Sequence, residues 1–110
     1  MELLTRKAKE QFEKWLKKQP FARYNTYTKK IIIHGKEYSE LNESFVQTLN
    51  IDWFDSVKIH IGIETKNVDS FRTFIYEMPH TFWMENKFSN RKDALESAIQ
   101  KANEIYNERF

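Results

Sequence analysis

Between residues 57 and 64 the chain reads VKIHIGIE, in which apolar and polar residues alternate without a break. Successive side chains of a β-strand point to opposite faces, so this pattern predicts a strand that is buried on one face and solvated on the other. Such a strand needs neighbouring strands and an apolar layer against its buried face. The rest of the chain has to supply both.

Two amphipathic helical patterns, one near each end of the chain, can supply the apolar layer. The first runs from about residue 2 to 19, and Pro20 ends it because the residue before a proline is driven out of the α region. The second begins at Asn90, with Asp93 completing a capping-box-like pattern, and runs to about residue 107. The two apolar stripes are Leu4, Ala8, Phe12, Trp15 and Leu16, and then Leu95, Ala98, Ile99, Ala102, Ile105 and Tyr106.

Further strands are predicted on both sides of the alternating segment. Residues 27–33 and a shorter run at 36–41 flank a His34-Gly35 pair, which predicts a hairpin in which Gly35 has the positive φ of a tight turn. After a polar turn at 65–70, residues 71–78 are apolar on both faces and should lie in the centre of the sheet.

Pro79 stops that central strand, and residues 81–88 can form another one. Residues 42–56, NESFVQTLNIDWFDS, fit neither period, and we interpret them as a connection with one or two helical turns. The pattern therefore predicts an α+β fold in one domain, residues 1–110. We expect a two-layer sandwich, with a four- to five-stranded, mostly antiparallel sheet and an N-terminal and a C-terminal helix packed on one face.

The composition limits the compartment and the class of function. The chain has 110 residues, of which 40% are hydrophobic and 15% aromatic, enough for the core of one domain. It has no Cys, which excludes disulfides and thiolate chemistry and fits a reducing cytoplasm. The first residues lack the apolar run of a signal peptide, and no stretch is long enough to span a bilayer. We expect a soluble cytoplasmic protein without a membrane partner.

Charge is divided along the chain. Residues 1–36 contain ten Lys or Arg and three Glu, a net charge of +7, whereas residues 37–110 contain eight Lys or Arg and thirteen Asp or Glu, a net charge of −5. A polarity of this kind favours a partner with an acidic surface, a nucleic acid, or a head-to-tail copy of the same chain.

The sequence offers little for catalysis. His34, His60 and His80 share no metal-ligand spacing, and no nucleophile and base pattern accompanies them. Asp52 and Asp55 could form a carboxylate dyad, but Asp more often caps a helix or closes a turn. With two glycines in the whole chain, no phosphate-binding glycine motif is possible. We therefore expect no enzyme, no metal site and no cofactor.

A basic and aromatic segment is the best candidate for binding an anionic partner. Cations that contact phosphate are interleaved with aromatic rings that can stack on a base. The alternative is a solvated helix end followed by an edge strand whose lysines discourage aggregation, and the modest total charge favours that alternative. The candidate residues are Lys14, Lys17, Lys18, Arg23, Tyr24, Tyr27, Lys29 and Lys30.

A second candidate is the pair Trp53 and Phe54, which lies between Asp52 and Asp55 in the expected connection. Adjacent side chains cannot both point the same way, so one of the two rings could be exposed as a protein-interface hot spot. The alternative is that both rings fill the core, and the need of a small domain for large apolar groups favours it.

Three stretches, LTRKAKEQFEKWL, DWFDSVKIHIGIE and SNRKDALESAIQKANEIYNERF, cover about half of the chain. Together they resemble small proteins encoded by bacterial phages and prophages, mainly through WFDSV with the alternating strand and through the ending KANEIYN. The resemblance implies a bacterial host and, by analogy with phage proteins that disable host machines, an anti-CRISPR-type inhibitor.

Three hypotheses of function follow. The leading one is a non-enzymatic phage or mobile-element protein that binds and inhibits a host nucleic-acid-handling complex, such as a CRISPR-Cas effector. The second is a small RNA-binding module that uses the basic and aromatic segment. The third is a homo-oligomeric structural or regulatory protein whose basic and acidic faces pair between copies.

Overall fold

The computed structural model of the chain describes residues 3–67, 70–84 and 87–110, and these form three α-helices and two three-stranded antiparallel sheets. The helices are α1 (Arg6–Lys17), α2 (Glu43–Ser56) and α3 (Arg91–Arg109), and a short 3-10 helix, η1, covers Tyr38–Glu40. The first sheet consists of β1 (Ala22–Asn25), β2 (Lys30–Ile33) and β3 (Lys36–Glu37). The second consists of β4 (His60–Asn67), β5 (Ser70–Glu77) and β6 (His80–Trp83).

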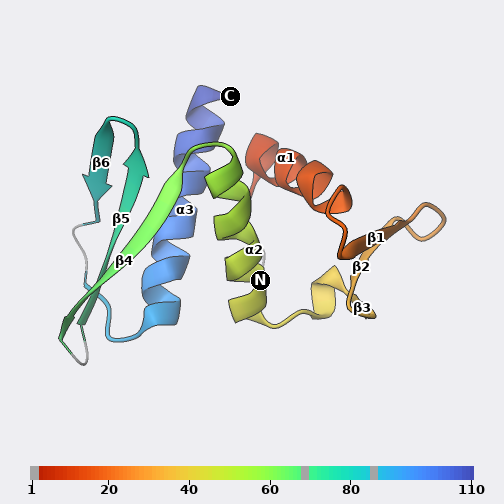
Figure 1. Ribbon diagram of the computed structural model, residues 1–110, viewed down its shortest axis with the longest axis horizontal. Helices are drawn as coiled ribbons and strands as arrows, with labels where there is room; N and C mark the ends of the chain where they lie inside the picture. Colours follow the sequence, from red (N-terminus) through yellow and green to blue (C-terminus); the bar gives the residue numbers. More distant parts are fainter. Residues whose placement is uncertain (1–2, 68–69, 85–86) are drawn as a thin grey trace.

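The α+β class is confirmed, but the single sheet of four to five strands is wrong. Figure 1 shows the two sheets at opposite ends of the molecule, with the helices between them. Helices α2 and α3 pack against one face of the second sheet, whereas α1 contacts α2, α3 and β1. The layer over the alternating strand is therefore made by α2 and α3, and the N-terminal helix lies beyond them.

The physical reason for two sheets is α2, which replaces the expected connection by a full helix of 14 residues. The side chain of Asn42 caps it by accepting a hydrogen bond from the backbone N–H of Phe45 at 3.1 Å. The buried stripe contains two polar residues, Gln47 and Asn50, which hide the helical period from a hydropathy pattern. Because this helix separates the hairpin from β4, the two groups of strands do not join.

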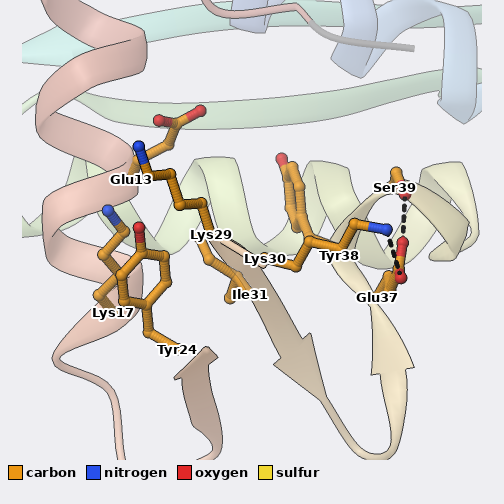
Figure 2. A pocket seen from close by; sticks show the side chains of 9 residues that line it. All are labelled: Glu13, Lys17, Tyr24, Lys29, Lys30, Ile31, Glu37, Tyr38 and Ser39. Carbon is orange, nitrogen blue, oxygen red and sulfur yellow. Dashed lines mark hydrogen bonds and ion pairs between the residues drawn. The ribbon is translucent and has the colours of Figure 1, made fainter. Parts of the chain in front are cut away.

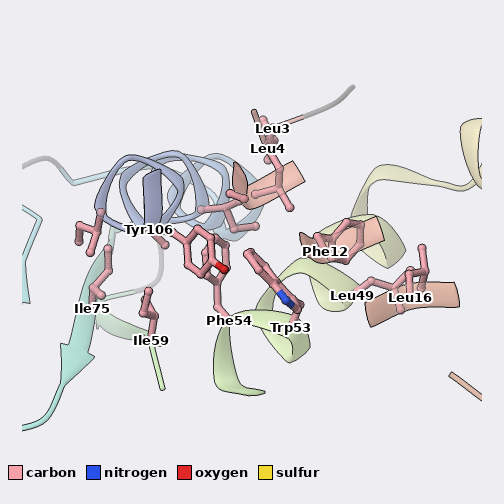
Figure 3. Close-up of a cluster of buried hydrophobic side chains, with 14 of the residues drawn as sticks. Leu3, Leu4, Phe12, Leu16, Leu49, Trp53, Phe54, Ile59, Ile75 and Tyr106 are labelled. Carbon is pink, nitrogen blue, oxygen red and sulfur yellow. The ribbon is translucent and has the colours of Figure 1, made fainter. Parts of the chain in front are cut away.

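Trp53 and Phe54 both lie in the core, so neither is an exposed hot spot, and the favoured interpretation of two core rings agrees with the structure (Figure 3). The exposed fraction of Trp53 is 2%, and its ring centroid lies 4.9 Å from that of Tyr106 and 6.0 Å from that of Phe12. Phe54 is fully buried beside Ile59. Trp53 fills the space where α1, α2 and α3 meet, Phe54 lies beside it in the same core, and neither ring offers a surface to a partner.

The first helix begins later than expected, and the last one agrees with its pattern. Residues 1 and 2 lie outside the described part of the chain, Leu3 and Leu4 are buried without being helical, and α1 starts at Arg6. The α3 helix begins after Asn90, whose Oδ1 accepts a hydrogen bond from the backbone N–H of Asp93 at 2.8 Å, as predicted.

The strands of the first sheet are shorter than predicted and more numerous. Gly35 has a φ of 80°, which confirms its place in the turn between β2 and β3. Residues 27–29 belong to a turn instead of a strand, and β1, which was not predicted, pairs with β2 in antiparallel register. Three of the four β1 residues are exposed, so no apolar pattern indicates it.

In the second sheet β5 is central, as predicted, between β4 and β6. The β4 strand starts at His60 and not at Val57, and it runs to Asn67, so residues 65–67 belong to a strand instead of the expected turn at 65–70. Ser70 already belongs to β5, and residues 68 and 69 lie outside the described residues. The β6 strand ends at Trp83, and Phe88 returns to form an isolated bridge with Phe71. None of the helices in the described ranges combines the length and the apolar composition needed to cross a membrane.

Candidate functional site

A protruding turn between β1 and β2 presents the most exposed aromatic ring among the described residues. The side-chain Oδ1 of Asn25 accepts hydrogen bonds from the backbone N–H groups of Tyr27 and Thr28, at 2.9 and 3.1 Å. Lys29 adopts a φ of 57° and closes the turn by donating its backbone N–H to the carbonyl of Asn25 at 2.7 Å. The turn leaves Tyr27 97% exposed at its tip.

The end of α1 and the first sheet enclose a pocket of about 230 Å³ (Figure 2). Four of the residues singled out in the sequence line it together, and they come from α1, β1, β2 and the turn between the two strands. The lining residues are Glu13, Lys17, Tyr24, Lys29, Lys30, Ile31, Glu37, Tyr38 and Ser39.

Lys17 and Tyr24 form the closest contact between a cation and a ring at this pocket. The Nζ atom of Lys17 lies 4.1 Å from the centroid of the Tyr24 ring, within the range of a cation–π interaction. The last turn of α1 carries the lysine and β1 carries the tyrosine, so the contact also fixes the helix end against the sheet. The phenol ring and the ammonium group thereby face the same pocket (Figure 2).

Carboxylates moderate the positive charge of the pocket. Lys30 Nζ lies 3.0 Å from Glu37 Oε1, and the other oxygen of Glu37 accepts a hydrogen bond from Ser39 at 3.5 Å. Within the described ranges, Lys17 and Lys29 form no ion pair with a carboxylate. These two lysines are therefore the cations that the pocket can offer to an external anion.

The other predicted basic residues lie outside the pocket lining. Lys14 forms an exposed ion pair with Glu10 at 3.5 Å, one turn earlier in α1. Lys18 follows the last residue of α1 and is exposed. Arg23 is exposed on β1, where side chains alternate between the two faces, so it points away from its neighbour Tyr24.

The structure adds Glu13 and Glu37 to the site, which the sequence interpretation did not include. Glu37 reaches Lys30 because β2 and β3 pair in antiparallel register, with Ile32 opposite Glu37. The contact between Lys30 and Glu37 could have been predicted from the hairpin, because antiparallel strands bring a lysine before the turn close to a glutamate after it.

Outside the pocket, the groups considered for chemistry do not assemble. His60 Nδ1 lies 2.7 Å from Asp55 Oδ1 on a solvent-accessible surface, and Asp52 is exposed on α2. Across the residues that the structure describes, no three His, Asp or Glu side chains gather into a potential metal site.

Comparison of the chain with protein-family models, with curated proteins and with solved structures finds no significant match.

Proposed function

We propose that this protein is a non-enzymatic binding protein that engages RNA through its basic-aromatic surface. We define this surface by five residues, which are Lys17, Tyr24, Tyr27, Lys29 and Lys30. The proposal concerns the chemistry of the contact, in which lysines bind phosphate oxygens and tyrosines stack on bases.

The observation that carries the proposal is the convergence of Lys17, Tyr24 and Lys29 on one pocket. A cation already placed against an aromatic ring can contact a phosphate while the ring contacts the adjoining base or ribose. The exposed ring of Tyr27 extends the same surface to the tip of the turn. Covering an almost fully exposed ring with a planar ligand is favourable, because the ring is removed from water.

Fluorescence anisotropy with a short labelled oligouridylate tests the proposal across a range of salt concentrations. Each lysine that neutralises a phosphate of a single strand contributes about 0.7 to the slope of log K against log salt. We expect Lys29→Glu with Lys30→Glu to weaken binding at low salt and to reduce that slope by about 0.7, the contribution of Lys29, because Glu37 already pairs with Lys30. Binding that does not change with salt would contradict the proposal.

A matched control separates the basic-aromatic surface from the charge of the whole protein. Lys87→Glu with Lys101→Glu changes the net charge by the same amount. Both lysines are exposed, and neither lines the pocket. We expect this control to alter affinity only slightly. Equal losses in the two double variants would indicate a long-range charge effect in place of a binding surface.

The resemblance to phage and prophage proteins supports a wider hypothesis, in which the RNA belongs to a host ribonucleoprotein such as a CRISPR-Cas effector that this protein inhibits. The divided charge agrees with a partner that exposes both RNA and basic protein grooves. Affinity purification from a bacterial host, with readout of both protein and RNA, tests it. Recovery of no stoichiometric partner would reject the inhibitor hypothesis while leaving direct RNA binding open to the anisotropy test.

A further inference from the structure

The second sheet has one face that no described helix covers. Ile61 and Ile75 point toward α2 and α3 and pack in the core, so the alternate residues of β4, β5 and β6 point the other way. Figure 1 shows no element on that side of the sheet. We call it the outer face, and it carries His60, Gly62 and Glu64 from β4, Arg72, Phe74 and Tyr76 from β5, and Thr81 and Trp83 from β6. Glu64 pairs with Arg72 across the strands, but the guanidinium of Arg72 lies against the Trp83 ring, on the β6 side of β5.

Gly62 lets an aromatic ring lie flat on the outer face. It pairs with Phe74 across the two strands, and a Cβ atom built on Gly62 would lie 2.1 Å from Cζ of that ring. The ring therefore occupies the space directly above the glycine. A ring lying along a sheet presents a π surface outward, which a ring standing on the sheet does not.

Two more groups continue this surface toward the edge strand. The ring of Trp83 lies 4.8 Å from that of Phe74 between centroids, and the guanidinium carbon of Arg72 lies 4.4 Å from the Trp83 ring centroid. The indole is nevertheless 45% exposed. A cation beside an exposed ring provides positive charge where a stacked base would bring its phosphate.

On the other side of Phe74, the row ends at Tyr76 and His60. Their rings lie 6.3 Å apart with an interplanar angle of 30°, and Tyr76 is 37% exposed. Residues on the same face of a strand repeat about every 6.6–6.8 Å, so Phe74 and Tyr76 present successive rings at the scale of neighbouring nucleotides. The row thus combines repeated rings with the guanidinium of Arg72 at one end and the imidazole of His60, which is hydrogen-bonded to Asp55, at the other.

We propose that the outer face binds the unpaired bases of a single-stranded RNA by stacking, with Trp83 and Tyr76 as the principal platforms and Arg72 as the phosphate contact. A single-stranded nucleotide fits this arrangement because its base can stack on the exposed indole while its phosphate meets the guanidinium beside that ring. The inference names the ligand class of the proposed function but rests on different residues in a different sheet.

Fluorescence titration with short oligouridylate tests this proposal. Loss of one base stack by truncation to alanine corresponds to roughly 5- to 150-fold weaker binding. We expect Trp83→Ala and Tyr76→Ala each to weaken binding within this range, and bound RNA to quench a tryptophan signal that Trp83→Phe removes. Binding of a fully paired duplex should not depend on these substitutions, because its bases are stacked internally.

Phe45→Ala is a matched control, since Phe45 is 38% exposed on α2, outside the outer face. It should leave the affinity unchanged, and urea unfolding should verify that all variants are folded. If Trp83→Ala and Tyr76→Ala bind oligouridylate as tightly as Phe45→Ala, the proposal is overturned.

The test distinguishes the two surfaces. If Lys29→Glu with Lys30→Glu weakens RNA binding and Trp83→Ala does not, the basic-aromatic surface is retained and the outer face is rejected. If only Trp83→Ala weakens RNA binding, the outer face is retained and the basic-aromatic surface is rejected. Absence of any RNA binding rejects both. If sedimentation instead shows a dimer of the free protein that Trp83→Ala converts to a monomer, the outer face is an interface between copies and the stacking proposal is wrong.

Discussion

The side-chain Oδ1 of Asn107, near the end of α3, accepts a hydrogen bond from the backbone N–H of Ala8 in the first turn of α1 at 2.9 Å. The first N–H groups of a helix have no partner within it, and the N-cap side chain usually supplies one. Here the N-cap residue Thr5 makes no such bond. Its backbone N–H and its hydroxyl bind Asn103 instead, at 2.9 and 3.0 Å. One helix is therefore capped by another.

Replacing Asn107 by Ala should destabilise the fold, although Ala favours the helix interior more than Asn does. The variant leaves the N–H of Ala8 without its partner, and the loss of a helix cap costs about 1 kcal/mol of unfolding free energy. Urea unfolding measures the change. Gln100→Ala, at an exposed position of the same helix, is the control and should be neutral or slightly stabilising. Equal effects of both substitutions would argue against capping in trans.

The late start of α1 is a clear example of what a sequence pattern cannot provide. The apolar stripe of α1 is local and predicts a helix, but the start at Arg6 depends on Thr5 being bound to Asn103, 98 residues away. The α3 helix has its cap in its own sequence, Asn90 with Asp93, and its prediction agrees with the structure. A helix end can thus be predicted from the sequence when its cap lies next to it in the chain, and not when the cap comes from another helix.

The same distinction applies to the sheets and to the candidate site. The lysines and tyrosines of the basic-aromatic surface are close in sequence, so their common location could be predicted. The 4.1 Å contact between Lys17 and Tyr24 could not, because it needs β1, whose residues carry no apolar alternation. The outer face was missed because its rings come from β5 and β6, and only the pairing of Gly62 with Phe74 and of Phe74 with Trp83 brings them together.

Asn50 should be a position where a substitution stabilises the protein. It is fully buried on α2, and neither its Oδ1 nor its Nδ2 has a hydrogen-bond partner among the described residues. Burying an unpaired amide costs about 1–3 kcal/mol, so Asn50→Leu, whose larger side chain has the same branched shape, should raise the unfolding free energy by that amount less the cost of fitting the extra volume. Urea unfolding provides the measurement.

Gln47 offers the comparison for this prediction, because it lies on the same buried stripe but is paired. Its Nε2 donates a hydrogen bond to the carbonyl of Lys92 at 3.1 Å. Gln47→Leu should therefore raise the unfolding free energy less than Asn50→Leu does, or lower it. A loss of stability in Asn50→Leu would show that the amide makes a favourable interaction.

Gly62 should not tolerate even a methyl group while Phe74 lies above it. The added Cβ would overlap the ring at 2.1 Å, and overpacking of this kind costs about 1–3 kcal/mol, although Ala is ordinarily no worse than Gly in a strand. In a background with Phe74→Ala the cost of Gly62→Ala should largely disappear. A double-mutant cycle in urea measures this coupling, and additive effects would contradict the contact.

Glu43 and Lys92 connect the first turn of α2 to the first turn of α3 by an exposed ion pair. The hydrogen bond from Lys92 and its positive charge lower the pKa of Glu43, and the same contacts raise the pKa of Lys92. The stabilisation from Glu43 is therefore present above the ordinary carboxyl pKa and is lost as the pH falls through the lowered one. The contribution of Lys92 is present below its ordinary pKa and is lost as the pH rises through the raised one.

Lys92→Met should return the pKa of Glu43 toward its ordinary value, since both the hydrogen bond and the opposite charge are removed. Titration of the Glu43 carboxyl by NMR measures the pKa shift directly. It does not depend on the contribution of the pair to the unfolding free energy, which is small for exposed pairs. Lys101→Met removes an equivalent charge whose Nζ lies 3.5 Å from Glu104, and it should leave the Glu43 titration unchanged. An unaltered Glu43 midpoint in Lys92→Met would mean that the two helices are not joined by this pair in solution.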